Sequence, residues 1–439
     1  MSPGSISRGG ESVDSERLLR IIRGELVETT GCTDPGAIVL AVAVAAQALG
    51  RTPGDVEVVL SPEVYKNAVS VGIPGTGRRG AEQAAALGVE MAEYADDGLA
   101  IMNRVTPEKV AASLTHLEQG GVRVGYAGDC PDKLYIQARV RAGAEEALAV
   151  IQGDYDAVSR LERNGRELPL TRVVSAAPET LAETFDIEEA LDALECIPLD
   201  ELEFLLRAAE MNKAAASDLK DLRFGGALAR MTAGLAGRHA CAALGKLYTG
   251  AAVEARMCGL VRPITAIAGS GNIGIIALLG VLGAGEGLEA SREELIRALA
   301  VSTVVTITVK RILTRMTNVC GCTVAGASGV AAGTVSLLGG SRARMDEAIQ
   351  AVLGAFSGVV CDGAKESCAY KASATAGSAI EYAFFAVGDG VAIPQGMGVV
   401  GSTLAQTLAN LGKLNEQGMR EVGSCILEII RTNQKERRP

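Results

Sequence analysis

Four cysteines are gathered in two short stretches of the second half of the chain. Cys320 and Cys322 lie in NVCGCTVAGASGVAAG, and Cys361 and Cys368 lie in SGVVCDGAKESCAYKASA. A fifth, Cys32, opens the segment CTDPGAIVLAVAVAA. All five stand beside Gly, Asp, Thr or Ser, at breaks between small-residue helical segments where a thiolate can face a cavity. Because the chain has only two histidines, we expect sulfur rather than imidazole to carry its metal or nucleophile chemistry.

The spacing of these cysteines admits three interpretations. Thiolates at Cys322, Cys361 and Cys368 could hold an iron–sulfur cluster, which needs several cysteine donors. A structural zinc site is the second, although zinc sites usually show two short-spaced pairs, and the separation of Cys320 from Cys322 is too tight for that pattern. The third is buried, inert cysteine in a core of small residues.

Polar side chains at other glycine-rich breaks are candidates for substrate binding. Ser270 and Asn272 lie in GSGNIG, where free backbone N–H groups could cradle a carboxylate. Lys66 and Asn67 end PEVYKN, and Thr76 lies in the GIPGTG segment that follows. Lys66, Asn67 and Thr76 could hold an acidic substrate, or they could simply form a turn. GSGNIG could equally be a helix break that serves packing.

Two lysines accompany the late cysteines in CDGAKESCAYK. Lys365 and Lys371 could act as bases if they are buried, since burial lowers the pKa of a lysine, or they could form a solvated pair on a helix face. Cys32 stands at the start of a predicted helix, where the helix dipole lowers the pKa of a thiol. Glu254 and Arg256, in VEARMCG, are expected to form a structural ion pair.

Composition narrows the class of protein. The net charge is −10 and no long basic run is present, which argues against nucleic acid as a partner. Hydrophobic residues make up 48% of the chain, but the best candidate span, Ile264–Gly283, is interrupted by Ser, Asn and five glycines. A membrane-embedded transporter is therefore only the non-enzymatic alternative. The polar start of the chain lacks the apolar core of a signal peptide, so ten cysteines indicate a reducing cytoplasm.

Hydrophobic periodicity predicts the organisation of the chain. Helices are expected at 15–26 and 35–49, strands in DVEVVLSPEVY, AVSVGIP, GVRVGYAG and KLYIQARVRAG, and an almost wholly helical region without a clear strand at 180–387. We therefore expect an α+β fold, with a small mixed α/β domain inserted in or preceding a large helical domain that carries the late cysteines. The expected segments are a disordered lead (1–14), N-terminal helices packing on the helical domain (15–54), a mixed α+β domain (55–175) and a helical catalytic domain (176–439).

Six motifs follow one another across nearly the whole chain in an order that is unlikely to arise by chance. They are GCTDP, SPEVYKN with AVSVGIPGTG, EARM, AGSGNIG, CGC with VAGASGVAAG, and CDGAK with SCAYK. In these motifs the chain resembles the L-cysteine desulfidase group within the iron–sulfur L-serine dehydratase α-chain superfamily. The resemblance implies an oxygen-sensitive 4Fe–4S cluster with three protein cysteines and one open iron, and β-elimination without pyridoxal phosphate.

The resemblance also assigns roles to individual cysteines. It implies that Cys322, Cys361 and Cys368 are the cluster ligands, with Cys32 or Cys320 as an alternative ligand. Cys32 is preferred as an active-site thiol near the cluster. The remaining cysteines receive no role and are interpreted as structural; they are Cys130, Cys196, Cys241, Cys258 and Cys425.

The implied reaction converts L-cysteine to pyruvate, ammonia and sulfide, with the open iron acting as a Lewis acid. The α-proton would be taken by Lys365, Lys371 or the thiolate of Cys32, while Ser270 and Asn272 would bind the carboxylate. L-Serine or a larger β-substituted amino acid is the alternative substrate. Two positions depart from the family pattern and could reshape the pocket; they are Ile273 and Tyr370. A cytoplasmic homodimer with a small amino-acid substrate, and with no nucleic acid or membrane partner, is expected.

Overall fold

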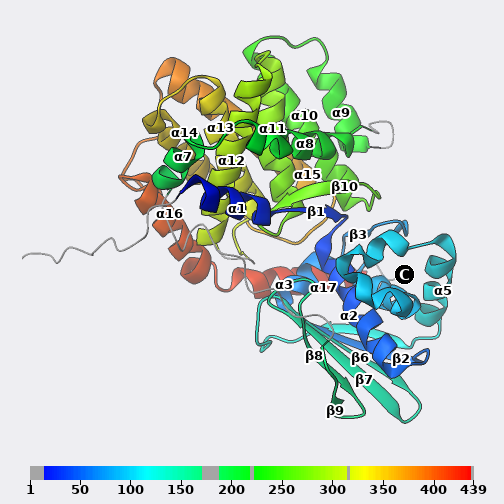
Figure 1. The fold of residues 1–439 in the computed structure, drawn as a ribbon. Helices are drawn as coiled ribbons and strands as arrows, with labels where there is room; N and C mark the ends of the chain where they lie inside the picture. Colours follow the sequence, from blue (N-terminus) through cyan, green and yellow to red (C-terminus); the bar gives the residue numbers. More distant parts are fainter. Residues whose placement is uncertain (1–13, 171–186, 218–221, 314–316, 437–439) are drawn as a thin grey trace, which may run out of the picture.

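The computed structural model describes residues 14–170, 187–217, 222–313 and 317–436; the expected lead, 1–14, falls almost wholly outside these residues. Two hydrophobic cores form within the described residues. One lies around a β-sheet, and the other lies among packed helices (Figure 1). The expected α+β fold, with a large helical part, is confirmed.

The sheet has six strands in the order β5-β2-β6-β7-β8-β9, of which only β5 and β2 run parallel. Its strands are β2 (Asp55–Leu60), β5 (Val122–Tyr126), β6 (Tyr135–Ala142), β7 (Glu145–Gln152), β8 (Val158–Arg163) and β9 (Arg166–Glu167). Alternation along β2 buries Val56, Val58 and Leu60 and leaves Asp55 and Glu57 on the opposite face. The sheet therefore has one apolar and one polar face.

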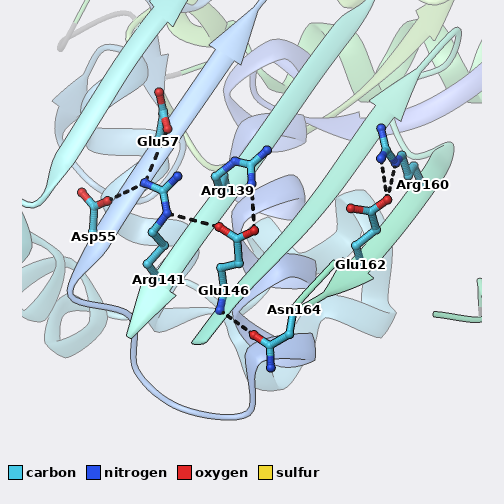
Figure 2. Close-up of polar contacts among 8 residues, drawn as sticks. All are labelled: Asp55, Glu57, Arg139, Arg141, Glu146, Arg160, Glu162 and Asn164. Atoms are coloured by element: carbon cyan, nitrogen blue, oxygen red, sulfur yellow. Dashed lines mark hydrogen bonds and ion pairs between the residues drawn. The ribbon is translucent and has the colours of Figure 1, made fainter. Parts of the chain in front are cut away.

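The polar face is covered by ion pairs between neighbouring strands (Figure 2). Arg141 of β6 donates to Asp55 on β2 at 3.1 Å and to Glu146 on β7 at 3.3 Å. Arg139 donates to the same Glu146 at 3.1 Å. Because these side chains are partly exposed to water, each pair adds little stability, and the network mainly keeps this face polar.

Helices cover the apolar face of the sheet. Those that contact the strands are α2 (Thr33–Leu49), α3 (Pro62–Ala68) and α4 (Ala81–Glu90), while η1 (Ala92–Arg104) packs on α2 and α5 (Pro107–Glu118) packs on α4. A short hairpin of β3 (Gly72–Ile73) and β4 (Arg78–Arg79) belongs to the same part. The expected boundaries put α2 with the helical domain, but it packs on β6 and β7. Because α2 carries apolar residues on all its faces, it is buried in the core around the sheet. The expected strand at PEVY is instead helix α3, which Ser61 caps by accepting from the Val64 N–H at 3.4 Å.

The second core lies among helices that pack closely. They are α1 (Ser15–Glu25), α7 (Ile187–Glu195), η2 (Asp200–Leu202), α8 (Glu203–Ala214), α9 (Arg223–Thr232), α10 (Arg238–Met257), α11 (Gly271–Gly287), α12 (Arg292–Ile312), η3 (Cys322–Gly326), α13 (Ala327–Leu337), α14 (Arg342–Phe356), α15 (Cys368–Phe384), η4 (Phe385–Asp389), α16 (Leu404–Lys413) and η5 (Leu414–Gly418). A Cβ at Gly283 of α11 would lie 2.5 Å from the backbone nitrogen of Gly245 on α10. Glycine there allows the two helix backbones to touch.

A strand lies in the region that was expected to be almost wholly helical, without a clear strand. Strand β10 (Pro263–Ile267) pairs antiparallel with β1 (Leu26–Thr30), with Leu26 opposite Ile267. The run of apolar letters through β10 and α11 has no period that separates a short buried strand from a helix. This pairing ties the N-terminal segment to the helical part just before the GSGNIG turn. Among the described helices, none combines the length and hydropathy needed to cross a membrane.

The C-terminal helix α17 (Val422–Glu436) returns to the sheet-containing part and lies beside α3 (Figure 1). Leu427 is 2% exposed and belongs to the core around the sheet. Arg431 lies over the ring of Tyr126, 5.9 Å from its centroid. The last helix, which the expected boundaries place in the helical domain, therefore connects the two parts of the molecule.

Replacing Leu427 with Ala should loosen this connection, since removing a buried leucine leaves a cavity and costs about 2–5 kcal/mol. We expect a lower free energy of unfolding in a denaturant titration and faster amide exchange across α3. Ile429→Ala is the matched control, because Ile429 on the same helix is 49% exposed, and its effect should stay within about 0.5 kcal/mol. Equal effects of the two variants would contradict the docking of α17.

Candidate active site

A cavity of about 120 Å³ lies where the sheet-containing part meets the helical part. Five cysteines line it, and we call it the cysteine cavity: Cys32, Cys320, Cys322, Cys361 and Cys368. Its polar lining also includes Asp34, Glu63, Lys66, Asn67, Tyr155, Arg256, Ser270, Asn272, Lys310, Asp362 and Lys371. The cysteines that the sequence singles out are thus brought together, with several cations around them.

A short backbone pairing brings the two late cysteine segments together. Val319 and Val360 form an isolated antiparallel bridge. Beside it, the Cys320 N–H donates to the Val359 carbonyl, and the Cys361 N–H donates to the Asn318 carbonyl, both at 2.7 Å. These bonds hold Cys320 and Cys361 on neighbouring segments although they are distant in sequence.

One buried asparagine holds the first of these segments in place. The Oδ1 of Asn415 accepts from the N–H groups of Asn318 and Val319 at 3.0 and 3.1 Å, and its Nδ2 donates to the Leu313 carbonyl at 3.3 Å. Asn415 is 1% exposed, so water cannot take over these contacts. No feature of the sequence indicated this role.

Several helices begin at the cavity wall. Cys32 is the N-cap residue of α2, Ser270 is that of α11, and Cys368 is the first residue of α15. Cys322 opens η3, which continues into α13. Because helix N-termini carry partial positive charge and free N–H groups, they favour thiolates and other anions in the cavity.

The cysteine thiols influence one another. Interaction with the neighbouring Cys322 thiol, together with the charge of Lys371, holds the pKa of Cys320 below its usual value, while the same interaction and burial raise the pKa of Cys322. Burial raises the pKa of Cys368 to about 11. The charges of Cys361 and Cys368 both act on Cys322, so the four late thiols share one electrostatic environment.

The two lysines of CDGAKESCAYK have different surroundings. Lys371 lines the cavity and donates to the Val360 carbonyl at 2.9 Å and to Asp362 Oδ1 at 2.7 Å. Burial opposes its charge, but the hydrogen bond to Asp362 and the charge of Cys320 outweigh burial and raise the pKa of Lys371. Lys365 is absent from the lining and donates to the carbonyls of Asp362 and Gly363. Both lysines therefore hold the loop that carries Cys361.

The residues expected to bind substrate divide into two groups. Lys66 and Asn67, on α3, line the cavity, and the buried Lys66 ammonium donates to the Cys361 carbonyl at 2.9 Å. Ser270 also lines it and caps α11 by accepting from the Ile273 N–H at 3.5 Å. Thr76 lies in the turn between β3 and β4, donates to the Ile73 carbonyl, and is not among the lining residues.

Asp34 and Tyr155 are cavity residues that sequence reasoning missed. The thiol of Cys32 donates to Asp34 Oδ2 at 3.7 Å, and Asp34 Oδ1 accepts from Asn67 at 3.4 Å and from the Tyr155 hydroxyl at 3.3 Å. Burial raises the pKa of Asp34 to about 6, and burial with the charge of Asp34 raises the pKa of Cys32 to about 12. The expected lowering of the Cys32 pKa by the helix dipole is therefore wrong, because burial outweighs it. The sequence indicated Asp34 only as part of a helix start. No sequence pattern indicated a role for Tyr155, which follows β7.

Arg256, at the end of α10, also lines the cavity, and its Nη1 donates to Asn272 Oδ1 at 3.0 Å. The expected ion pair with Glu254 does not form. Glu254 instead accepts from the N–H groups of Phe224 and Gly225 at 2.9 and 2.8 Å.

The two departures from the family pattern lie in different places. Ile273 is buried and lines the cavity, so it can affect what fits there. Tyr370 is 60% exposed and stacks on Phe224 with ring centroids 3.9 Å apart. Tyr370 therefore faces outward rather than into the cavity.

The cavity suits an iron–sulfur cluster better than a single metal ion. In the described part of the chain, no three His, Cys, Asp or Glu side chains form a group that could hold one ion. A cluster differs because each cysteine binds a different iron atom, so its ligands stand farther apart. Free thiols, nearby ammonium and guanidinium groups and helix N-termini are the groups that would hold and neutralise such a cluster.

Comparison with known proteins decides the family. Residues 96–428 match the family model described as serine dehydratase alpha chain. The chain belongs to this family. It is similar to the UPF0597 protein of Methanocella arvoryzae, with 41% identity over 425 residues that cover 96% of this chain and 99% of that protein. It is also similar to the UPF0597 protein of Parabacteroides distasonis, with 34% identity over 96% of this chain and 99% of that protein. Members of this family use iron–sulfur clusters.

Replacing Asn415 with Ala should disorder the first cysteine segment of this family member. The change leaves the buried N–H of Val319 and the part-buried N–H of Asn318 without an acceptor; a buried N–H left unsatisfied costs about 1–3 kcal/mol, and the part-buried one costs less. We expect a lower free energy of unfolding and less iron bound per chain after anaerobic reconstitution. Asn410→Ala is the control, because Asn410 on α16 donates only to the Val399 carbonyl, away from the cysteines. Undiminished iron in the Asn415 variant would show that its contacts do not hold the site.

Proposed function

We propose that this protein is an iron–sulfur-dependent lyase that converts L-cysteine to pyruvate, ammonia and sulfide by β-elimination, without pyridoxal phosphate. The observation that carries the proposal is the convergence of Cys322, Cys361 and Cys368 on one small cavity. Membership of the serine dehydratase alpha-chain family supports the reaction class. The cavity lining also includes carboxylates and cations that can bind the amino and carboxylate groups of an amino acid.

In this proposal Cys322, Cys361 and Cys368 hold the cluster, and Cys320 stands beside them as the alternative ligand. When bound, the cluster supplies an open iron that acts as a Lewis acid on the leaving group of the substrate. Lys371 keeps its positive charge through Asp362 and offsets the negative charge of the thiolates. Lys66 holds the backbone of Cys361 from the other part of the molecule.

Among the three expected bases, the contacts favour Cys32. Lys365 and Lys371 are held by the carbonyls and carboxylate of their own loop, whereas the thiol of Cys32 faces Asp34 within the cavity. We propose that the α-proton moves to Cys32 Sγ while the thiol proton moves to Asp34 Oδ2. With a pKa of about 6, Asp34 is mostly ionised at neutral pH, whereas Cys32, with a pKa of about 12, stays a thiol. The thiol therefore gives its proton to Asp34 only as its sulfur takes the α-proton, in one concerted step. The aminoacrylate that is released hydrolyses in water to pyruvate and ammonia.

L-Serine is the second candidate substrate, because the chain belongs to the serine dehydratase alpha-chain family. The apolar Ile273 in the cavity lining favours a thiol over a hydroxyl leaving group, since a buried hydroxyl needs a hydrogen-bond partner. Measuring sulfide, pyruvate and ammonia with each substrate separates the two.

The cluster assignment is tested with Cys361→Ala. Protein reconstituted anaerobically with iron and sulfide should be brown and release sulfide from L-cysteine, whereas this variant should lose both the chromophore and the activity. Cys425→Ala should keep both, because Cys425 is exposed on α17. Full activity in an iron-free Cys361→Ala protein would contradict the proposal. Wild-type protein that is active with L-serine and inactive with L-cysteine would instead be assigned as a dehydratase.

The base is tested with Cys32→Ala. We expect this variant to keep its iron and to lose about 100-fold or more in kcat, the contribution of a positioned general base. Cys130→Ala should leave kcat unchanged, because the Cys130 thiol donates to carbonyls in the sheet-containing part. Loss of iron from Cys32→Ala would instead make Cys32 a ligand, and an unchanged kcat would remove it from the mechanism.

A further inference from the structure

The guanidinium of Arg256 has a buried hydrogen-bond donor for which the described part of the chain supplies no acceptor. Arg256 is 6% exposed, and its Nη1 donates to Asn272 Oδ1 at 3.0 Å. Its Nε finds no acceptor among the described residues. Leaving a donor of a buried cation unsatisfied is costly. Because Arg256 lines the cysteine cavity, the missing acceptor points to a ligand that occupies it.

Glu254, two residues before Arg256, and Asp34, which lines the same cavity, are both engaged by other groups. Glu254 accepts from two backbone N–H groups at the start of α9. Asp34 feels the charge of Arg256, but its hydrogen-bond donors are the neutral groups of Cys32, Asn67 and Tyr155. No ion pair joins Arg256 to either carboxylate within the described residues, so the guanidinium charge is available to an anion.

The position of the guanidinium depends on a glycine. A Cβ at Gly271 would lie 2.5 Å from Arg256 Nε and 2.6 Å from its Cζ. Arg256 therefore rests on the first turn of α11, and the absence of a side chain at Gly271 makes room for it. The partial positive charge of this helix N-terminus and the charge of Arg256 act on the same side of the cavity.

The amide of Asn272 contacts protein groups at both its oxygen and its nitrogen. Its Oδ1 accepts from Arg256, and its Nδ2 lies 3.6 Å from the sulfur of Met257. Although the sequence suggested direct carboxylate binding, both ends of this side chain are engaged by the protein. Its contacts instead fix the orientation of the guanidinium.

We propose that Arg256 binds the α-carboxylate of the substrate and that Asn272 and Gly271 are positioning residues that hold the guanidinium for it. A guanidinium suits this role because its planar N–H groups match the geometry of a carboxylate. The identity of the substrate as a small amino acid rests on the proposed function. The enzyme then requires a free α-carboxylate, so amides and esters of the same amino acid are not substrates.

The test compares two ligands that lack a leaving group and differ only at the carboxyl end. L-Alanine and L-alaninamide are titrated by calorimetry into the anaerobic, cluster-loaded protein. We expect L-alanine to bind at least tenfold more tightly, because a charge-assisted hydrogen bond exceeds a neutral one. Arg256→Gln should remove this preference, and Arg256→Lys should restore part of it. With L-cysteine, Arg256→Gln should raise KM about tenfold to a hundredfold at the wild-type iron content.

Two further variants separate a binding role from a structural one. Gly271→Ala should displace only the flexible end of Arg256 and raise KM in the same direction, whereas Gly24→Ala on α1, with open space at its Cβ, should not. Arg78→Gln controls for loss of charge at an exposed site. Wild-type protein that binds L-alanine no better than L-alaninamide, or an Arg256→Gln protein that keeps the preference, would overturn the proposal. So would loss of iron from Arg256→Gln, which would mean that Arg256 serves the cluster.

Failure of the proposed function gives a different result. A loaded protein that turns over neither L-cysteine nor L-serine would remove the lyase assignment, yet the preference for L-alanine and its dependence on Arg256 could still be measured. Turnover of L-cysteine with an unchanged KM in Arg256→Gln would remove only the role of Arg256.

Discussion

The site depends on one short backbone pairing, in which 318–320 and 359–361 lie side by side around the bridge between Val319 and Val360. The helices η3, α13 and α15 pack on one another, and this bridge then fixes how the loops before η3 and α15 lie side by side, with their cysteines on one cavity. The pairing has few hydrogen bonds of its own. It persists because Asn415 supplies acceptors to one segment and Lys371 binds the carbonyl of Val360 on the other.

The cavity is shared between the two parts of the molecule. Lys66 and Asn67 come from α3 in the sheet-containing part, whereas the late cysteines come from the helical part. The bond from Lys66 to the Cys361 carbonyl crosses this boundary, and α17 returns from the helical part to pack on α3. Any movement of one part against the other therefore changes the distance from Lys66 and Asn67 to the late cysteines.

Charge in the cavity is balanced by groups with different tasks. Asp362 joins Lys365 and Lys371 into one cluster, which fixes the loop that begins with Cys361. Asp34 is held by neutral donors instead, so burial raises its pKa to about 6. Asp362, which is ion-paired to two lysines, keeps the loop with Cys361 in place. Asp34, which has no ion pair among the described residues, keeps a pKa close to neutral pH and can exchange protons.

The sequence by itself determined the α+β class, most of the helices and the membership of most candidate residues in one site. Periodic apolar residues set the helices, and the small residues beside the cysteines marked the breaks where chemistry could occur. Only the tertiary structure decided that β10 is a strand and that Thr76 lies in a turn outside the cavity lining. It alone also shows that Asp34, Tyr155 and Arg256 line the cavity and that Asn415 binds the segment before Cys320. The physical reason is that these roles follow from contacts between residues far apart in the chain. A sequence pattern records the periodicity and local propensity of each segment, but the burial and hydrogen-bond partners of a side chain exist only after the segments have packed.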